Sequence, residues 1–105
     1  MTARIAFRMQ LNAGQAEEYR RRHEAVPAAL KNLLKDAGIS DYSIFLDPQT
    51  HALFAVLRRE DAARVEALAG ADIMQAWWRD MADIMVTGAY HAPVTVVLEE
   101  MFYLA

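Results

Sequence analysis

Six segments with a regular hydrophobic pattern follow one another along this chain, in the order β-α-β-β-α-β. The first, "RIAFRMQL" at 4–11, alternates apolar and polar side chains with a period of two, which predicts a half-buried strand. The second repeats apolar residues at helical spacing over 16–37. Gly38 follows it, at the position where a left-handed residue ends many helices.

The second half of the chain begins with a predicted hairpin. Residues 39–47 and 51–59 are rich in β-forming side chains, and the "PQT" between them is typical of a turn. Asp61 then opens a second helical region that Gly70 splits in two. A last strand is expected within 94–104.

Local signals mark where the helices should begin and break. Asn12–Gln15 and Asp72–Gln75 both have the spacing of a capping box, in which the two side chains bond to free N–H groups of the first turn. Pro27 lies inside the first helical pattern and removes the bond that its N–H would donate to the carbonyl of His23. We therefore expect the helix to kink or restart there, with Pro27 in the first turn of the second part.

This order of elements predicts an α+β fold of the ferredoxin-like type, an antiparallel sheet covered by helices on one face. With 105 residues, the chain fits one domain, 1–105, and is too short to cover the other face as well. The strand at 53–57, "LFAVL", is apolar on both sides. We expect two copies to pack their sheets face to face in a homodimer that forms an α/β barrel.

Composition excludes several classes of protein. No apolar run approaches the roughly 20 residues of a membrane helix, and "MTARIAFRMQ" lacks the apolar centre of a signal peptide, so no membrane and a cytoplasmic location are expected. The net charge of −3 argues against a nucleic-acid partner. Acidic residues flank the run Arg20–Arg22, which we interpret as a solvated helix face rather than a phosphate site. With no cysteine, scattered histidines and no Gly-rich phosphate loop, neither a metal nor a cofactor is expected.

Histidine is the side chain whose ordinary pKa lies nearest neutral pH, so the three histidines are the first candidates for catalysis. His51 opens a strand after a turn and is expected to be exposed, and His91 lies in a loop. His23 differs, because it follows Tyr19 by four residues on the helix stripe that faces the sheet. It is either a half-buried structural histidine or a group that borders a pocket.

Three further aromatic residues favour a pocket. Tyr42 is in phase with the apolar residues of its strand, and the adjacent Trp77 and Trp78 differ by about 100° around their helix, so at least one faces any space beneath it. Rings with polar tips suit a monosaccharide, whose C–H faces lie on the rings while its hydroxyls form hydrogen bonds.

The stretches "MQLNAGQAEEYRRRH", "DYSIFLD", "LFAVL", "WWRDMADIM" and "FYL" resemble the L-rhamnose mutarotase family in order and spacing over nearly the whole chain. The resemblance implies a dimeric α/β barrel and cofactor-free interconversion of the α and β anomers of L-rhamnose. It implies His23 as the catalytic residue, with Tyr19, Tyr42, Trp77 and Trp78 binding the sugar. The chain departs from the family's usual "IWPEL" and "NPDNSPV" patterns just after His23 and at 88–94.

Mutarotation requires a proton to reach the ring oxygen as the C1 hydroxyl loses one, and the reverse on closure, which one imidazole can carry out. We expect His23 to protonate the ring oxygen on opening and to deprotonate the C5 hydroxyl on closing. Tyr42 or a bound water is expected at the C1 hydroxyl. The rival interpretations are a sugar-binding module without activity and, with less support, a monooxygenase or haem-degrading protein of the same barrel type.

Overall fold

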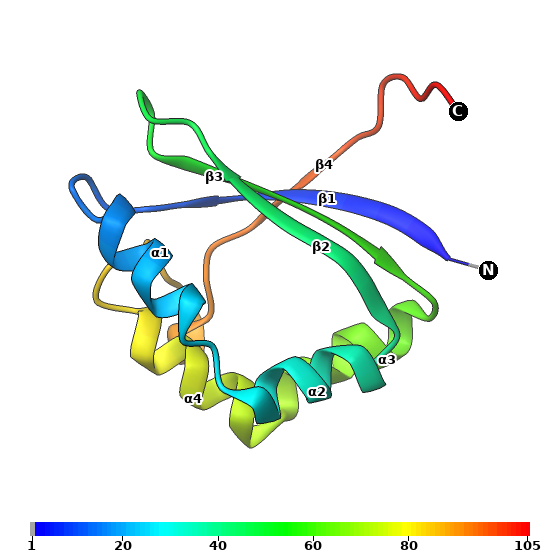
Figure 1. Cartoon of the computed structure of the whole chain (residues 1–105), viewed down its shortest axis with the longest axis horizontal. Coiled ribbons are helices and arrows are strands. Elements are labelled where there is room, and N and C mark those ends of the chain that lie inside the picture. The colour runs from blue at the N-terminus through cyan, green and yellow to red at the C-terminus, as the bar shows by residue number, and fades with distance from the viewer. Residues whose placement is uncertain (1) are drawn as a thin grey trace.

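The four strands form one antiparallel sheet in the spatial order β2-β3-β1-β4, and helices α1 to α4 all lie on the same face of it (Figure 1). The computed structural model describes residues 2–105. In chain order the elements are β1 (Ala3–Gln10), α1 (Ala16–Glu24), α2 (Ala28–Asp36), β2 (Ile39–Leu46), β3 (Ala52–Arg59), α3 (Ala62–Glu66), the short helix η1 (Ala67–Gly70), α4 (Asp72–Met81), the short helix η2 (Ala89–His91) and β4 (Val96–Leu98). This arrangement confirms the predicted ferredoxin-like α+β fold.

The core lies between the helices and the sheet, as the alternation in β1 predicts. Phe7 and Met9 of β1 pair with Ala55 and Leu53 of β3, and their side chains face the helices. Leu53 and Ala55 are almost completely buried there. The longest helix, α4, spans 10 residues, and no helix within residues 2–105 is long and apolar enough to cross a membrane.

A β-bulge in β2 decides which of its side chains face the helices. Ser40 pairs with Arg58 and Ser43 with Val56, so β2 contains one more residue than β3 over this interval. Asp41 lies in the bulge with a left-handed φ of 49°. Its carboxylate forms an ion pair with Nε of Arg58 at 3.2 Å. Tyr42 is in phase with Ile44 and Leu46, which pack against the core, and the bulge brings Ile39 to the same helix face.

The predicted break at Pro27 is confirmed, but its position differs from the prediction. Pro27 precedes the first turn of α2, with an extended ψ of 139°, and its carbonyl accepts the N–H groups of Leu30 and Lys31. The carbonyl of His23 is not left free either, because it accepts the N–H of Val26 at 3.4 Å. The residues between the two helices thus form a turn that uses His23 as an acceptor.

Both predicted capping boxes are wrong, since neither helix start has a side-chain cap. Gly14, with a φ of 81°, lets a turn close between Asn12 and Gln15, so α1 begins only after it. In the second box, the amide of Gln75 donates to the carbonyl of Ala69 instead. The second helical region opens at Asp61 as predicted, and the structure adds that its carboxylate caps α3 by accepting the N–H of Ala63 at 2.9 Å.

Gly38 forms the turn between α2 and β2, and its left-handed backbone can be tested by substitution. Its φ is 85°, and a Cβ there would lie 3.1 Å from Cβ of Glu60. Gly38→Ala should lower the free energy of unfolding by about 1–2 kcal/mol, because an L side chain is strained in this conformation. Gly70→Ala is the matched control, since a Cβ at Gly70 meets nothing within 4 Å. Urea denaturation measures both, and equal midpoints for the two variants would contradict this account of the turn.

Candidate active site

Three aromatic rings from two helices meet beneath the sheet. The rings of Tyr19 and His23, one turn apart on α1, are stacked with centroids 4.1 Å apart and planes 29° apart. The ring of Trp77 on α4 meets His23 at 5.2 Å and nearly at right angles. Tyr19 and Trp77 are half-buried and pack against the buried cluster around Leu53, so they hold the imidazole in place.

The backbone of α1 fixes the protonation pattern of His23. Its Nδ1 lies 2.9 Å from the carbonyl oxygen of Tyr19. A carbonyl oxygen can only accept, so Nδ1 must carry the proton and donate it. The neutral imidazole therefore has its lone pair on Nε2, where it can accept a proton from a bound molecule.

The surroundings also shift the pKa values of this cluster. Desolvation lowers the pKa of His23 below its usual 6.5, and the hydrogen bond to Tyr19 offsets part of that shift. Burial raises the pKa of Tyr19, and the proximity of Tyr42 raises it further. At neutral pH the imidazole is therefore mostly neutral, beside a protonated phenol.

Tyr42 approaches the cluster from the sheet. Its side chain is 39% exposed, yet enough protein surrounds the hydroxyl for desolvation to raise the pKa of Tyr42 to about 12. Tyr42 also contributes electrostatically to the raised pKa of Tyr19. Tyr42 can donate a hydrogen bond at neutral pH, but it is a poor source of phenolate.

The remaining sequence candidates lie less centrally. Trp78 is half-buried on α4 next to Trp77, and it is Trp77 whose ring contacts His23. His51 lies in the turn before β3 and His91 ends η2. The structure thus brings together Tyr19, His23, Tyr42 and Trp77, whereas the roles assigned to them and to Trp78 stay a prediction.

Sequence reasoning missed the role of Arg22. We predicted a solvated face for the whole arginine run, and this is wrong for Arg22, whose side chain is only 22% exposed. Its guanidinium donates to both carboxylate oxygens of Asp83, at 2.7 and 3.1 Å, and to the carbonyl oxygen of Asp80 at 2.7 Å. Because the partners lie about 60 residues away in sequence, no local pattern could reveal the contact.

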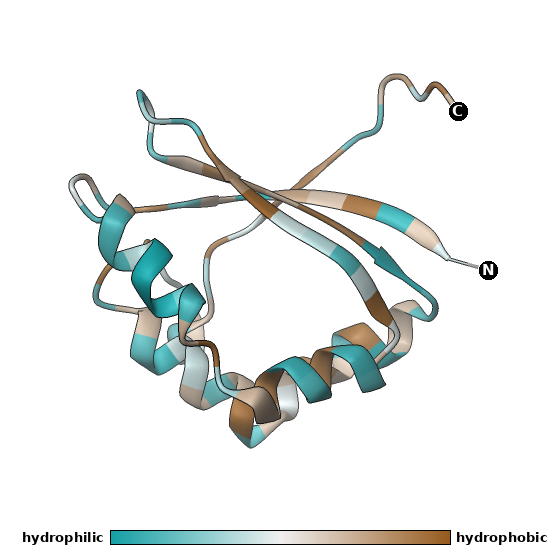
Figure 2. Ribbon diagram, in the orientation of Figure 1, coloured by the Kyte–Doolittle hydropathy of each residue, from teal (hydrophilic) through white to brown (hydrophobic). Residues whose placement is uncertain are grey.

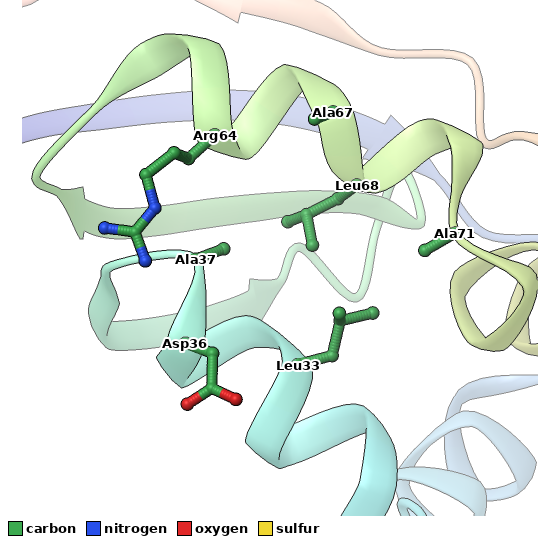
Figure 3. Close-up of a pocket in the computed structure, with 7 residues that line it drawn as sticks. All are labelled: Leu33, Asp36, Ala37, Arg64, Ala67, Leu68 and Ala71. Atoms are coloured by element: carbon green, nitrogen blue, oxygen red, sulfur yellow. The ribbon is translucent and has the colours of Figure 1, made fainter.

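Two surface hollows lie away from these rings. One of about 290 Å³ lies between α2 and α3, and its lining is mostly apolar and contains no aromatic ring for a sugar to stack on (Figure 3). Its lining residues are Leu33, Asp36, Ala37, Arg64, Ala67, Leu68 and Ala71. A second, of about 280 Å³, lies where β1 meets β4. Within residues 2–105, no group of three or more His, Asp or Glu side chains is placed to hold a metal ion.

The chain is similar over its whole length to L-rhamnose mutarotases. The family model described as L-rhamnose mutarotase matches residues 4–104. The L-rhamnose mutarotase of Burkholderia orbicola strain MC0-3 is 55% identical over 95% of this chain and 96% of its own. That of Mesorhizobium japonicum is 49% identical over the full length of both chains.

A solved structure agrees with the sequence comparison. The crystal structure of an L-rhamnose mutarotase from Formosa agariphila matches with a TM-score of 0.91 and 44% identity, covering 98% of this chain and 99% of that one. Fold, family model and relatives therefore agree, and this chain belongs to the L-rhamnose mutarotase family.

Proposed function

We propose that this protein, acting as a single domain over residues 1–105, interconverts the α and β anomers of L-rhamnose or a related 6-deoxy sugar. The observation that carries the chemistry is the fixed imidazole of His23, with Nδ1 bonded to the backbone and Nε2 available. Tyr19 and Trp77 hold this imidazole in place through ring contacts. Membership of the family supplies the substrate class.

Ring opening begins with neutral His23 as a base. Nε2 accepts the proton of the C1 hydroxyl, the C1–ring-oxygen bond breaks as the C1 carbonyl forms, and the imidazolium returns the proton to the departing ring oxygen. Both oxygens are bonded to C1, so one nitrogen can reach the two in turn. The products are the open-chain aldehyde with a free C5 hydroxyl and a neutral imidazole, which balances every atom and charge.

Closure reverses these steps on the other face of the aldehyde. After rotation about the C1–C2 bond, His23 accepts the C5 hydroxyl proton, the oxygen attacks C1, and the proton passes to the carbonyl oxygen. Tyr42, protonated because its pKa is raised to about 12, donates a hydrogen bond to that oxygen. Tyr19 orients the imidazole, and Trp77 and Trp78 form the wall on which the C–H face of the sugar lies.

Substitution of His23 tests the assignment of the base. His23→Ala should reduce anomeric exchange of L-rhamnose by about 10²–10⁴-fold, the range general acid–base groups contribute. Saturation-transfer NMR measures the exchange directly. His51→Asn is the matched control, because His51 lies in the β2–β3 turn with a left-handed φ of 64° that asparagine tolerates. Equal exchange in His23→Ala and wild type would remove His23 from the mechanism, and sugar binding without exchange in wild type would identify a binding module.

The lowered pKa of His23 predicts the pH dependence of the rate. The base must be neutral, so exchange should persist below pH 6.5 and fall only as the pH drops through the lowered pKa. Because the pKa of His23 is lower in the folded than in the unfolded chain, protonation of His23 favours unfolding. The free energy of unfolding should therefore be highest above pH 6.5 and fall as the pH drops from 6.5 to the lowered pKa. A titration of the imidazole Cε1 proton by NMR, assigned with His23→Ala, should give a midpoint below 6.5. A midpoint at or above 6.5 would contradict the buried, neutral base.

We also propose that the protein is a homodimer joined through the open face of the sheet. That face carries the cross-strand pair Phe45 and Phe54 together with Val56, and Phe45 is 62% exposed. Figure 2 shows apolar residues along the strands of the sheet. Beyond β4 the chain runs past its own sheet, and Met101 and Phe102 are more than 80% exposed there (Figure 1). A second copy of the chain would cover both surfaces.

Light scattering after size exclusion tests the dimer. Wild type should have about twice the mass of the 11.9 kDa chain. Phe54→Glu places a charge in the middle of the open face and should give a monomer. Ile73→Glu, on the outer surface of α4, is the control and should leave the mass unchanged. A wild type of 11.9 kDa at high micromolar concentration, or a Phe54→Glu protein of unchanged mass, would refute the interface.

A further inference from the structure

Arg22 makes the one ion pair between α1 and the end of α4 that the structure records in the part of the chain it describes. Both Nη atoms donate to the Asp83 carboxylate, and Nη1 also donates to the carbonyl oxygen of Asp80 in the last turn of α4. On its own helix the guanidinium is 3.7 Å from the carboxylate of Glu18. A planar fork that binds two oxygens of one carboxylate fixes an angle as well as a distance.

The two ends of this contact lie beside the two rings of the proposed site. His23 follows Arg22 directly, and Trp77 precedes Asp80 by one helical turn. The edge-on ring contact of 5.2 Å between His23 and Trp77 therefore joins the same two helices as the ion pair. Any rotation of α1 against α4 must change both together.

Apolar packing alone holds α1 weakly. None of its residues is fully buried, and Tyr19 is its principal contact with the core. The loop before α1 adds a second polar link, since Asn12 donates to the carbonyl oxygens of Asp83 and Ile84 through its side chain and backbone N–H. The segment 83–84 thus anchors both the start and the end of α1.

We propose that Arg22 and Asp83 form a positioning pair that sets the separation and angle of the His23 and Trp77 rings, and so aligns Nε2 with the sugar. The pair touches no substrate and is not catalytic. This inference rests on the proposed role of His23. The hydrogen bond from Arg22 holds the pKa of Asp83 below its usual range, so the carboxylate remains charged at neutral pH.

A positioning pair and a merely stabilising pair make different predictions. Asp83 is 64% exposed at its side chain, and ion pairs of this exposure add little to the free energy of unfolding. A displacement of about 1 Å in a reacting group, by contrast, can reduce the rate about 10²-fold. The loss should therefore appear in kcat and in the ring geometry, with little change in the unfolding midpoint.

The experiment compares Arg22→Ala, Asp83→Ala and the double variant with Arg21→Ala as control. Arg21 immediately precedes Arg22, but within the described residues its exposed side chain pairs only with Glu18. We expect about 10- to 100-fold lower kcat with a smaller change in KM in each single variant, no further loss in the double, and unchanged kcat in Arg21→Ala. The nuclear Overhauser effect between the ring protons of His23 and Trp77 should weaken in the first three proteins only.

The ring-proton measurement needs no activity, so it separates this inference from the proposed function. An undiminished Overhauser effect in Arg22→Ala would overturn the positioning role, whether or not wild type accelerates exchange. A fall in kcat that merely follows the loss of folded protein would overturn it too. Failure of wild type to accelerate exchange would count against the proposed function, while a weakened ring contact would still support the pair.

Discussion

In α1, Nδ1 of the His23 imidazole forms a hydrogen bond with the carbonyl oxygen of Tyr19 one turn earlier, and the proposed chemistry of the site depends on this bond. It selects the neutral tautomer with a lone pair on Nε2, and it keeps the ring flat against Tyr19. The carbonyl oxygen of Tyr19 has a second lone pair for this bond, beside the one that serves the helix. The break that follows His23 provides the turn that leads to α2.

The ring cluster also depends on how the sheet and α4 present their residues. Tyr42 faces the helices in phase with Ile44 and Leu46, and the bulge at Asp41 lets Ile39 face them as well. Arg22 joins the end of α1 to the end of α4 near Trp77. A hydrogen bond within α1, two ring contacts and an interhelical ion pair therefore surround one imidazole.

The sequence predicts much of this because most of the fold follows from local periodicity. The alternation in β1, the left-handed Gly38 and the helix start at Asp61 are local patterns, and each is found as expected. The first capping box failed because Gly14 allows a tight turn that competes with the cap, and the second because Gln75 donates to the carbonyl of Ala69 instead. The partner of Arg22 could not be predicted, since a contact between α1 and the segment after α4 exists only once the sheet brings the two together. The bulge has one local signal in the sequence. Apolar Ile39 is out of phase with Tyr42, Ile44 and Leu46, yet it is buried on the same face of the sheet.

A structure of the protein crystallised with L-rhamnose tests the central claim most directly. The account predicts a pyranose beside Tyr19 and Trp77, with its ring oxygen and C1 oxygen both within hydrogen-bonding reach of Nε2 of His23 and the C1 oxygen near Tyr42. A sugar bound in another part of the molecule, such as the apolar hollow between α2 and α3, or one whose C1 faces away from His23, would contradict it.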